Sequence, residues 1–385
     1  MSLVLDEHRQ YLSDLNRLDA YSRAIAELVK PGAVVVDLGA GTGIMGLLAC
    51  RAGASRVYCI EETSLIGLAR DLFQANGFAD RVTFIKDIST HIALPEQADL
   101  VIADQIGRFG FEAGVFEYFN DARKRFLKPG GVLLPSRVDL MVAPVEHAEL
   151  WRQIEFWNQR PAGFDFRPAR RIAVNTGYPT SLQPQQLLAP PGMIVALATE
   201  ECPDSISGIE ATTEIEKAGM LHGIGGWFRA QLSPQMTMSN GPLEPQRIGR
   251  RNVFFPIDKP VAVEEGDRVR VAMRIQPRDM MVTWKIEVWE KRTPRDGSSA
   301  PKARFTHSTF QGMLVCKEDL EKIQPRFVPS LTPRGDARRS ILELCDGRNA
   351  LADIEREIYR RHPQLFTSAA QAAAFVAEVV TRYSR

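Results

Sequence analysis

A glycine-rich turn near the N-terminus constrains the fold more than any other feature of this sequence. The apolar run at 33–38 leads into Gly39-Ala40-Gly41-Thr42-Gly43, and a helical pattern follows through Cys50. A strand that turns on glycines into a helix brings backbone N–H groups and the positive end of the helix dipole to one point. Glycine is needed because a Cβ would hold a ligand away from the backbone. The pattern predicts an α/β fold with a ligand site at this turn.

The segments around the turn alternate between helix and strand. An amphipathic stretch at about 6–29 precedes the turn, and a Pro-Gly-Gly turn is expected at 129–131. Strands are expected at 56–60, 82–85, 98–103 and 132–134, and helices at 64–76 and 116–127. Strands separated by helices are typical of parallel order, so residues 1–137 are predicted to form a doubly wound, Rossmann-like sheet.

A carboxylate stands directly after the second predicted strand. Glu61 follows the run at 56–60, and an acid at that point accepts hydrogen bonds from ribose hydroxyls. Together with the glycine turn, it predicts a nucleoside site. The spacing of Gly41, Gly43 and Gly46 also fits the dinucleotide fingerprint, so spacing alone leaves both cofactor types open. Glycines that merely permit a tight turn are the remaining alternative.

Likeness to known sequences separates these cofactors. The segments DLGAGTG, VYCIE, ANGFADRVTFIKD and LKPGGVLLP resemble the class I S-adenosylmethionine methyltransferases, and more narrowly the protein arginine methyltransferase family. The resemblance extends from residue 6 to about 318. It implies S-adenosylmethionine as the cofactor and a β-barrel-like domain after the Rossmann-like sheet. The cofactor-binding residues that it implies are His8, Arg17, Tyr21, Asp37, Gly39, Gly41, Gly43, Glu61, Asp87 and Thr90.

The N-terminal helix carries three residues in the family's order. Asp14, Arg17 and Tyr21 are spaced i, i+3 and i+7, so they share one helix face. By resemblance, Arg17 pairs with the cofactor's carboxylate, His8 approaches its methionine part, and Tyr21 covers the pocket. Thr90 aligns with the family's adenine-side glutamate, with Asp87 just before it. A solvated amphipathic face is the alternative for the helix.

The segment after the fourth strand departs from the family. Guanidinium is essentially always protonated, and the family grips it with two glutamates on a hairpin. Here Asp104 stands at the first position and Ala113 at the second, whereas Glu112 serves only if the loop is one residue shorter. Asp104 and Glu112 are predicted as the catalytic pair, and ion pairing with Arg108 is their alternative role.

The residues expected to bind the acceptor match the family less well than those expected to bind the cofactor. The family's Thr-His-Trp segment corresponds here to Arg247-Ile248-Gly249, so two residues that line the arginine pocket are missing. The favoured acceptor is a nitrogen of a peptide or protein, with arginine leading. The alternatives are N- or O-methylation of a small molecule such as free arginine, and a non-catalytic cofactor-binding scaffold.

The pattern after residue 135 indicates a β-rich substrate domain at 138–318. Strands are expected at 138–142, 193–197, 225–232, 252–257, 268–275, 282–289 and 305–310. Their spacing predicts a barrel or sandwich, with the basic segment 291–304 as a loop between the last two strands.

An arm at about 145–185 aligns with the insertion through which the family's subunits dimerise. Its apolar anchors are Trp151, Phe156, Trp157, Phe164 and Phe166. Aromatic residues of this kind are enriched in interfaces, so a homodimer is expected. The alternative is that these aromatics pack within the subunit.

The tail at 325–385 resembles the small winged-helix domain of PqqD-like proteins, on residues 341–348 and 351–354. Helices are expected at 340–344, 350–361 and 369–383. The resemblance implies a ribosomally made leader peptide bound by strand addition. A helical appendage for dimerisation or stability is the alternative.

Charge and cysteine usage exclude several classes of partner. The 48 Lys and Arg residues balance 47 Asp and Glu residues, so no global field favours nucleic acid or an anionic membrane. The five cysteines are scattered without a C-x-x-C pair, and neither a disulfide scaffold nor a metal site is expected. Because the sequence also lacks a signal-peptide core and a membrane-length apolar run, a cytoplasmic location is expected.

Overall fold

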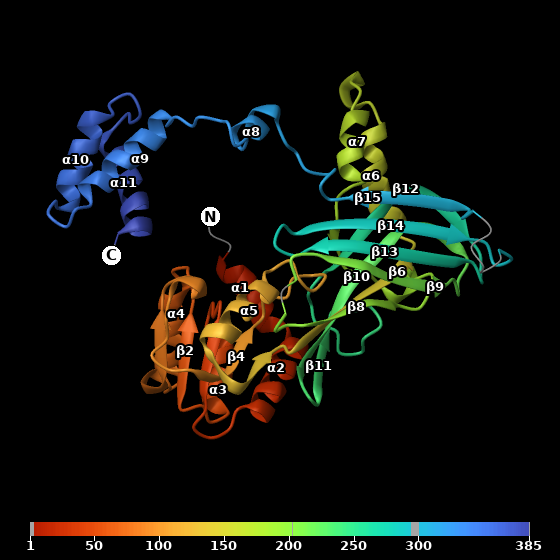
Figure 1. Cartoon of the computed structure of the whole chain (residues 1–385), viewed down its shortest axis with the longest axis horizontal. Helices are drawn as coiled ribbons and strands as arrows, with labels where there is room; N and C mark the ends of the chain where they lie inside the picture. The colour runs from red at the N-terminus through yellow and green to blue at the C-terminus, as the bar shows by residue number, and fades with distance from the viewer. Residues whose placement is uncertain (1–3, 202, 294–299, 385) are drawn as a thin grey trace. The chain divides into compact units, whose positions relative to one another are not determined.

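The computed structural model describes residues 4–201, 203–293 and 300–384 (Figure 1). The chain divides into two units, residues 1–313 and 314–385.

The first unit begins with the predicted parallel sheet, whose strand order is β3-β2-β1-β4-β5. All four pairings are parallel. The strand order reverses between β1 and β4, and ligands of such sheets bind at the carboxyl ends of the strands at this switch point. The strands are β1 (Val34–Leu38), β2 (Arg56–Ile60), β3 (Val82–Ile85), β4 (Ala98–Ala103) and β5 (Leu127–Leu134).

The helices of this region confirm the expected alternation, with one break. They are α1 (Val4–Ser13), α2 (Leu15–Leu28), α3 (Ile44–Arg51), α4 (Leu65–Ala75) and α5 (Val115–Arg125). The amphipathic stretch expected at 6–29 is two helices, because the Asp14 carboxylate accepts the Arg17 N–H at 3.2 Å and caps α2. The segment predicted as a turn at 129–131 lies within β5 but has no partner in β4: the pairing passes from Leu127 opposite Ala98 to Val132 opposite Leu100, and Gly130 has a φ of 79°.

Two antiparallel sheets follow and form the β-barrel-like part of the first unit. One sheet has the order β7-β12-β10-β6-β8, with β11 paired to β10, and the other has the order β15-β14-β13-β9. Trp284 of β14 is buried between them and donates its Nε1–H to the Pro256 carbonyl of β12 at 2.9 Å. The strands are β6 (Arg137–Val145), β7 (Tyr178–Thr180), β8 (Gly192–Ala198), β9 (Ile206–Glu214), β10 (Gly219–Ser233), β11 (Met236–Ser239), β12 (Asn252–Val263), β13 (Arg268–Gln276), β14 (Met281–Trp289) and β15 (Ala303–Ser308).

One hydrophobic core joins the parallel sheet to the β-rich part, running from Ala20 on α2 to Val288 on β14. Helix α2 lies against β10, where Ser233 hydrogen-bonds to the Glu27 carboxylate. The basic segment predicted as a loop at 291–304 lies partly outside the described residues, which omit 294–299.

The arm contains α6 (Ala148–Glu155) and α7 (Arg167–Ala173), which stand out from one end of the β-rich part in Figure 1. Trp151 is buried in a cluster within the subunit, under the Arg170 guanidinium, so it is not an exposed anchor. Phe156, Phe164 and Phe166 are exposed, with Phe164 at 70%. The predicted anchors therefore divide between internal packing and an exposed apolar surface.

The second unit contains helices and no strands in the part that the structure describes. It contains α8 (Lys317–Lys322), α9 (Pro333–Leu344), α10 (Leu351–Arg361) and α11 (Ala369–Tyr383). The last three pack around a small core that includes Ile341, Ile358 and Val376. The winged helix is not confirmed, because residues 314–384 contain no strand, whereas a wing is a β-hairpin and strand addition requires a sheet edge.

The described residues contain neither a membrane-spanning helix nor a metal-binding cluster. None of their helices is both long enough and apolar enough to span a membrane. In the same residues, no group of three or more His, Cys, Asp or Glu side chains is placed to hold a metal ion. Cys50, Cys59, Cys316 and Cys345 are free thiols, and Cys202 lies outside the described residues.

Candidate active site

The glycine turn between β1 and α3 is closely covered by side chains from other elements. Gly39, Gly41 and Gly43 have φ values of 62°, 54° and 77°, in the left-handed region that favours glycine. A Cβ on Gly39 would lie 1.9 Å from Nε2 of Gln105, and one on Gly41 would lie 2.6 Å from Cε1 of His8. A Cβ on Gly43 would instead meet Phe73, 2.7 Å away in the core. Gly39 and Gly41 therefore face the site, whereas Gly43 allows the turn to pack.

Asp37, at the end of β1, ties the strand to the helix. Its buried Oδ2 accepts the Gly46 N–H of α3 at 2.9 Å. Burial raises the pKa of Asp37 to about 7; the nearby Glu61 carboxylate adds to this, and the Gly46 N–H opposes it. The side chain also lines the large cavity described below.

Glu61, at the end of β2, braces the glycine turn from the other side. Its carboxylate accepts the Gly41 N–H at 3.0 Å and the Thr63 N–H at 2.9 Å. It lines a small cavity of about 90 Å³. Asp87 lines this cavity too, as predicted for the nucleoside side, but Thr90 is exposed and is absent from its lining, where Ile88 and Ser89 stand instead.

A larger cavity of about 670 Å³ adjoins the glycine turn. Four chain segments far apart in sequence line it: helix α1, the turn, the loop after β4 and the segment Gly249–Arg251 of the β-rich part. Gly39 and Gln105 line both cavities, so the two are neighbouring parts of one site. The predicted residues in its lining are His8, Arg17, Asp37, Gly39, Gly41, Asp104 and Glu112.

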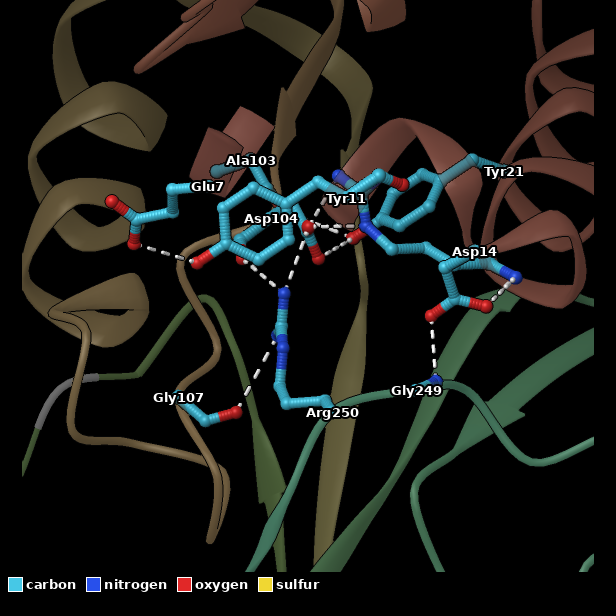
Figure 2. Close-up of polar contacts among 10 residues, drawn as sticks. Glu7, Tyr11, Asp14, Tyr21, Ala103, Asp104, Gly107, Gly249 and Arg250 are labelled. Atoms are coloured by element: carbon cyan, nitrogen blue, oxygen red, sulfur yellow. Dashed lines mark hydrogen bonds and ion pairs between the residues drawn. The ribbon is translucent and has the colours of Figure 1, made fainter. Parts of the chain in front are cut away.

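Asp104 is the centre of a buried charge cluster (Figure 2). Its Oδ2 accepts hydrogen bonds from Arg17 Nε at 2.6 Å and from Arg250 Nη2 at 2.9 Å, and its Oδ1 accepts the Tyr21 hydroxyl at 2.9 Å. Burial acts to raise the pKa of Asp104, but the two guanidinium groups outweigh it and lower the pKa below its usual range. The carboxylate is therefore ionised and already neutralised by this chain.

This cluster changes the role expected for Tyr21. The side chain is fully buried and is absent from the lining of both cavities. It lies beside Asp104 (Figure 2), so it supports that carboxylate and does not cover the cofactor pocket. Its neighbour Arg17 is only 6% exposed and does reach the large cavity.

Glu112 lines the large cavity but is engaged by its own loop. Its carboxylate accepts the Phe109 N–H at 2.9 Å and 3.0 Å, and the Phe111 N–H at 3.2 Å. Burial raises the pKa of Glu112, although these N–H groups oppose the shift. Among the described residues, no ion pair joins the exposed Arg108 to Glu112 or to Asp104. The structure therefore does not confirm the alternative role of the two acids as ion-pair partners of Arg108.

Sequence reasoning missed two residues of the site. Arg250 follows Gly249 in the segment aligned with the family's arginine pocket, and that position was the available signal. Gln105 follows Asp104 directly, and its Oε1 is buried without a hydrogen-bond partner among the described residues. It lies where the two cavities meet, so a ligand spanning both would pass beside this free acceptor.

The residues present fit S-adenosylmethionine. Gly39 and Gly41 line the large cavity without side chains of their own, Glu61 lines the small cavity where ribose hydroxyls would bind, and Arg17 reaches the large cavity with a guanidinium that suits a carboxylate. Bound there, the cofactor supplies an electrophilic methyl carbon attached to sulfur. Asp104 and Glu112 line the same cavity as the glycine turn, so a cofactor held at the turn would share that cavity with two acids.

Comparison with known families and relatives agrees with this reading. Residues 136–293 match the family model described as the arginine methyltransferase oligomerization subdomain, and residues 18–138 match the model described as ribosomal protein L11 methyltransferase. Protein arginine N-methyltransferase 6 of Xenopus laevis is 25% identical over 292 residues, which cover 71% of this chain and 84% of the relative. Protein arginine N-methyltransferase PRMT10 of Arabidopsis thaliana is 26% identical over 342 residues, covering 80% and 89%.

Solved structures share the fold. The Arabidopsis thaliana protein arginine methyltransferase 10 structure, which has an open conformation, superimposes with a TM-score of 0.67 at 23% identity, covering 79% of this chain and 98% of that one. The Trypanosoma brucei enzyme–prozyme heterotetramer with S-adenosylhomocysteine also gives a TM-score of 0.67, at 19% identity and with 78% and 97% coverage. The chain is therefore an S-adenosylmethionine-dependent methyltransferase related to the protein arginine methyltransferases.

Proposed function

We propose that this methyltransferase modifies a nitrogen of a peptide or protein, with arginine as the leading acceptor. The observation that carries the proposal is that Asp104 and Glu112 line the same cavity as Gly39 and Gly41. A cofactor held by the turn would therefore have two acids next to its reactive end. The names of the curated relatives, which align over most of this chain, support arginine as the acceptor.

Asp104 and Glu112 would divide the chemistry between them. Methyl transfer requires one nitrogen lone pair close to the methyl carbon and in line with the leaving sulfur, so positioning is most of the catalysis. The ionised Asp104 is a fixed anion that would hold a cationic acceptor. Glu112, whose pKa burial raises, is the better proton acceptor of the two. In the balanced reaction the acceptor nitrogen gains the methyl group and its proton passes to the Glu112 carboxylate.

A small-molecule acceptor is the second candidate, and the charges on the acceptor side favour it. Arg108, Arg250 and Arg251 line the large cavity, and guanidinium groups bind carboxylates and phosphates well. An anionic metabolite, including free arginine with its own carboxylate, would suit such a surface.

Mass spectrometry tests the proposal directly. Arginine-containing peptides and free arginine would each be incubated with the protein and S-adenosylmethionine, with Asp104→Asn as the comparison variant. The proposal predicts a gain of one methylene localised to an arginine nitrogen of a peptide, and its loss with Asp104→Asn. Modification of free arginine alone would support the second candidate, and modification of a different residue type would reject arginine.

We also propose that the protein is a homodimer and that it is cytoplasmic. The match of residues 136–293 to an oligomerization subdomain and the exposed Phe156, Phe164 and Phe166 of the arm support the dimer. The scattered cysteines are consistent with a reducing compartment. Fractionation of the source cells would test the location, and recovery with the membrane or secreted fraction would contradict it.

Recruitment of a leader-bearing peptide by the second unit is the last part of the proposal. The resemblance of residues 341–348 and 351–354 to PqqD-like proteins supports it. Because residues 314–384 contain no strand, binding by strand addition is not part of the proposal. Deletion of residues 314–385, the second unit, is expected to raise KM for a leader-bearing peptide and to leave the Kd for S-adenosylhomocysteine unchanged. An unchanged KM would reject the recruitment role.

A further inference from the structure

The Arg250 guanidinium pairs with Asp104, the acid that the proposed acceptor needs. Its Nη2 donates to Asp104 Oδ2 at 2.9 Å, and the guanidinium lies directly beside that carboxylate in Figure 2. Arg250 and Asp104 both line the large cavity, and their side chains are 14% and 15% exposed. The chain thus places one of its own guanidinium groups where the proposed function requires a guanidinium from outside.

The other contacts of Arg250 are long. Its Nη1 lies 3.4 Å from the Gly107 carbonyl oxygen, and its Nη2 lies 3.5 Å from the Asp104 carbonyl oxygen, both beyond the usual hydrogen-bond range. The segment that carries it is held independently, because the Gly249 N–H donates to the Asp14 carboxylate at 2.7 Å. The ion pair with Asp104 is therefore the main polar restraint on the side chain, and a competing guanidinium can replace it.

Displacement leaves Arg250 in need of another anion. Burial disfavours a charged guanidinium without a partner, yet its interactions with Asp104 raise the pKa of Arg250 and keep it charged. Arg17 cannot be that partner, because it is also a cation and pairs with the same Asp104 oxygen. Arg108 and Arg251 also line the cavity, and no ion pair joins either of them to an acid of the described chain. The other acids in the lining are engaged within the chain: Glu7 by the Tyr11 hydroxyl, Asp14 by the Gly249 N–H, Asp37 by the Gly46 N–H and Glu112 by the Phe109 N–H. A displaced Arg250 would therefore lack a free carboxylate of this chain.

From this geometry we infer that Arg250 is a specificity-determining residue that selects an arginine with a carboxylate next to it. The incoming guanidinium replaces Arg250 on Asp104, and the neighbouring acidic residue of the acceptor receives Arg250. An arginine among neutral residues supplies only the first contact and leaves Arg250 unpaired. This inference rests on the proposed function and names its substrate class.

Two matched peptides test the inference by binding and by turnover. One carries an arginine flanked by aspartates, and the other carries the same arginine flanked by asparagines. The Kd of each is measured in the presence of S-adenosylhomocysteine, and KM is measured with S-adenosylmethionine. The wild-type protein is expected to prefer the aspartate peptide about tenfold or more, which corresponds to ~1.4 kcal/mol.

Variants of Arg250 should remove that preference. Arg250→Ala and Arg250→Gln are expected to bind the asparagine peptide about tenfold more tightly than wild type, because Asp104 is no longer occupied by Arg250. Arg250→Lys keeps the charge and should keep part of the preference. Arg229→Ala serves as the charge-matched control, because it removes an exposed arginine of β10 that pairs with Glu244. Thermal unfolding of each variant checks that it folds. If Arg250→Ala does not fold, Arg250→Gln still tests the inference.

The inference is overturned if wild type shows no preference, or if Arg250→Gln keeps the full preference. A binding preference without methyl transfer to either peptide would retain the role of Arg250 and reject the proposed function. Methylation of both peptides with equal KM would retain the proposed function and reject the role of Arg250.

Discussion

Arg17 on α2 and Asp104 at the end of β4 form a buried ion pair, with Nε of Arg17 2.6 Å from Oδ2 of Asp104. The two residues stand on opposite sides of the proposed chemistry, since Arg17 is expected to hold the cofactor's carboxylate and Asp104 the acceptor. One oxygen, Oδ2, is shared by Arg17 and Arg250. In the proposed function, the cofactor and acceptor sites would therefore be joined through a single carboxylate.

Arg17→Ala is expected to weaken binding of S-adenosylhomocysteine about tenfold or more, because a charge-assisted contact to its carboxylate is lost. Asp104 keeps Arg250 and Tyr21 as partners, so the free energy of unfolding should fall by only about 1–3 kcal/mol. Calorimetric titration and urea unfolding measure the two effects. Arg23→Ala, which removes an exposed partner of Asp19, is the control for the helix. Unchanged cofactor affinity in Arg17→Ala would contradict the role of Arg17.

Asp37 predicts a pH dependence of stability. Its pKa is about 7 in the folded protein, above the value of an unfolded chain, so the folded state binds more protons between these two pKa values. The free energy of unfolding should therefore fall as pH rises from about 5 to about 7, by about 2–3 kcal/mol more in wild type than in Asp37→Asn, and the difference should level off above that range. Urea unfolding at a series of pH values measures it. Parallel curves for the two proteins would be inconsistent with a raised pKa.

Glu112 predicts a separation of stability from catalysis. Glu112→Ala removes the acceptor for the Phe109 and Phe111 N–H groups and should lower the free energy of unfolding by about 1–3 kcal/mol. Glu112→Gln keeps an acceptor oxygen and should lose less stability, yet kcat should fall about 100-fold because the amide cannot take a proton. Single-turnover kinetics and unfolding curves measure both. Wild-type kcat in Glu112→Gln would show that the carboxylate only braces the loop.

The exposed arm predicts a change of oligomeric state. Phe164→Asp places a charge at a 70% exposed apolar position of the arm and should convert a homodimer to a monomer. Light scattering after size-exclusion chromatography measures the mass. Met193→Asp changes a 51% exposed residue of β8 outside the arm and should leave the mass unchanged. A wild-type monomer, or a dimer that survives Phe164→Asp, would contradict the arm's role.

The fold was predictable wherever a local apolar run is buried. Strands β2 and β4 lie at the predicted residues 56–60 and 98–103, and α11 lies at 369–383. Strand β9 was missed because its residues Ile206–Glu214 are mostly exposed on alternate positions and include Gly208, so no continuous apolar run marks them. At 129–131 the Pro-Gly-Gly segment leaves the pairing with β4, as its turn residues predict, although it lies within β5.

From the residues alone the site was predictable only where they form a local motif, and the family resemblance added His8, Arg17, Asp104 and Glu112. The glycine turn, Asp37 and Glu61 follow strands in sequence and come together through the parallel order of the sheet. Arg250 contacts Asp104 across 146 positions of the sequence. The dipeptide Arg250-Arg251 does not indicate which of the two side chains turns inward. The burial of Tyr21 beside Asp104 likewise depends on how α2 packs, which spacing on a helix does not determine.

The most direct measurement is the affinity of S-adenosylhomocysteine for wild type, Glu61→Gln and Glu265→Gln, by calorimetric titration. Glu61 is buried at the glycine turn, whereas Glu265 is exposed, has the same charge and lines neither cavity. Tight binding to wild type is predicted, with a loss of about tenfold or more in Glu61→Gln and of less than about twofold in Glu265→Gln. Absence of binding to wild type, or equal affinities for the three proteins, would contradict the placement of the cofactor at this turn.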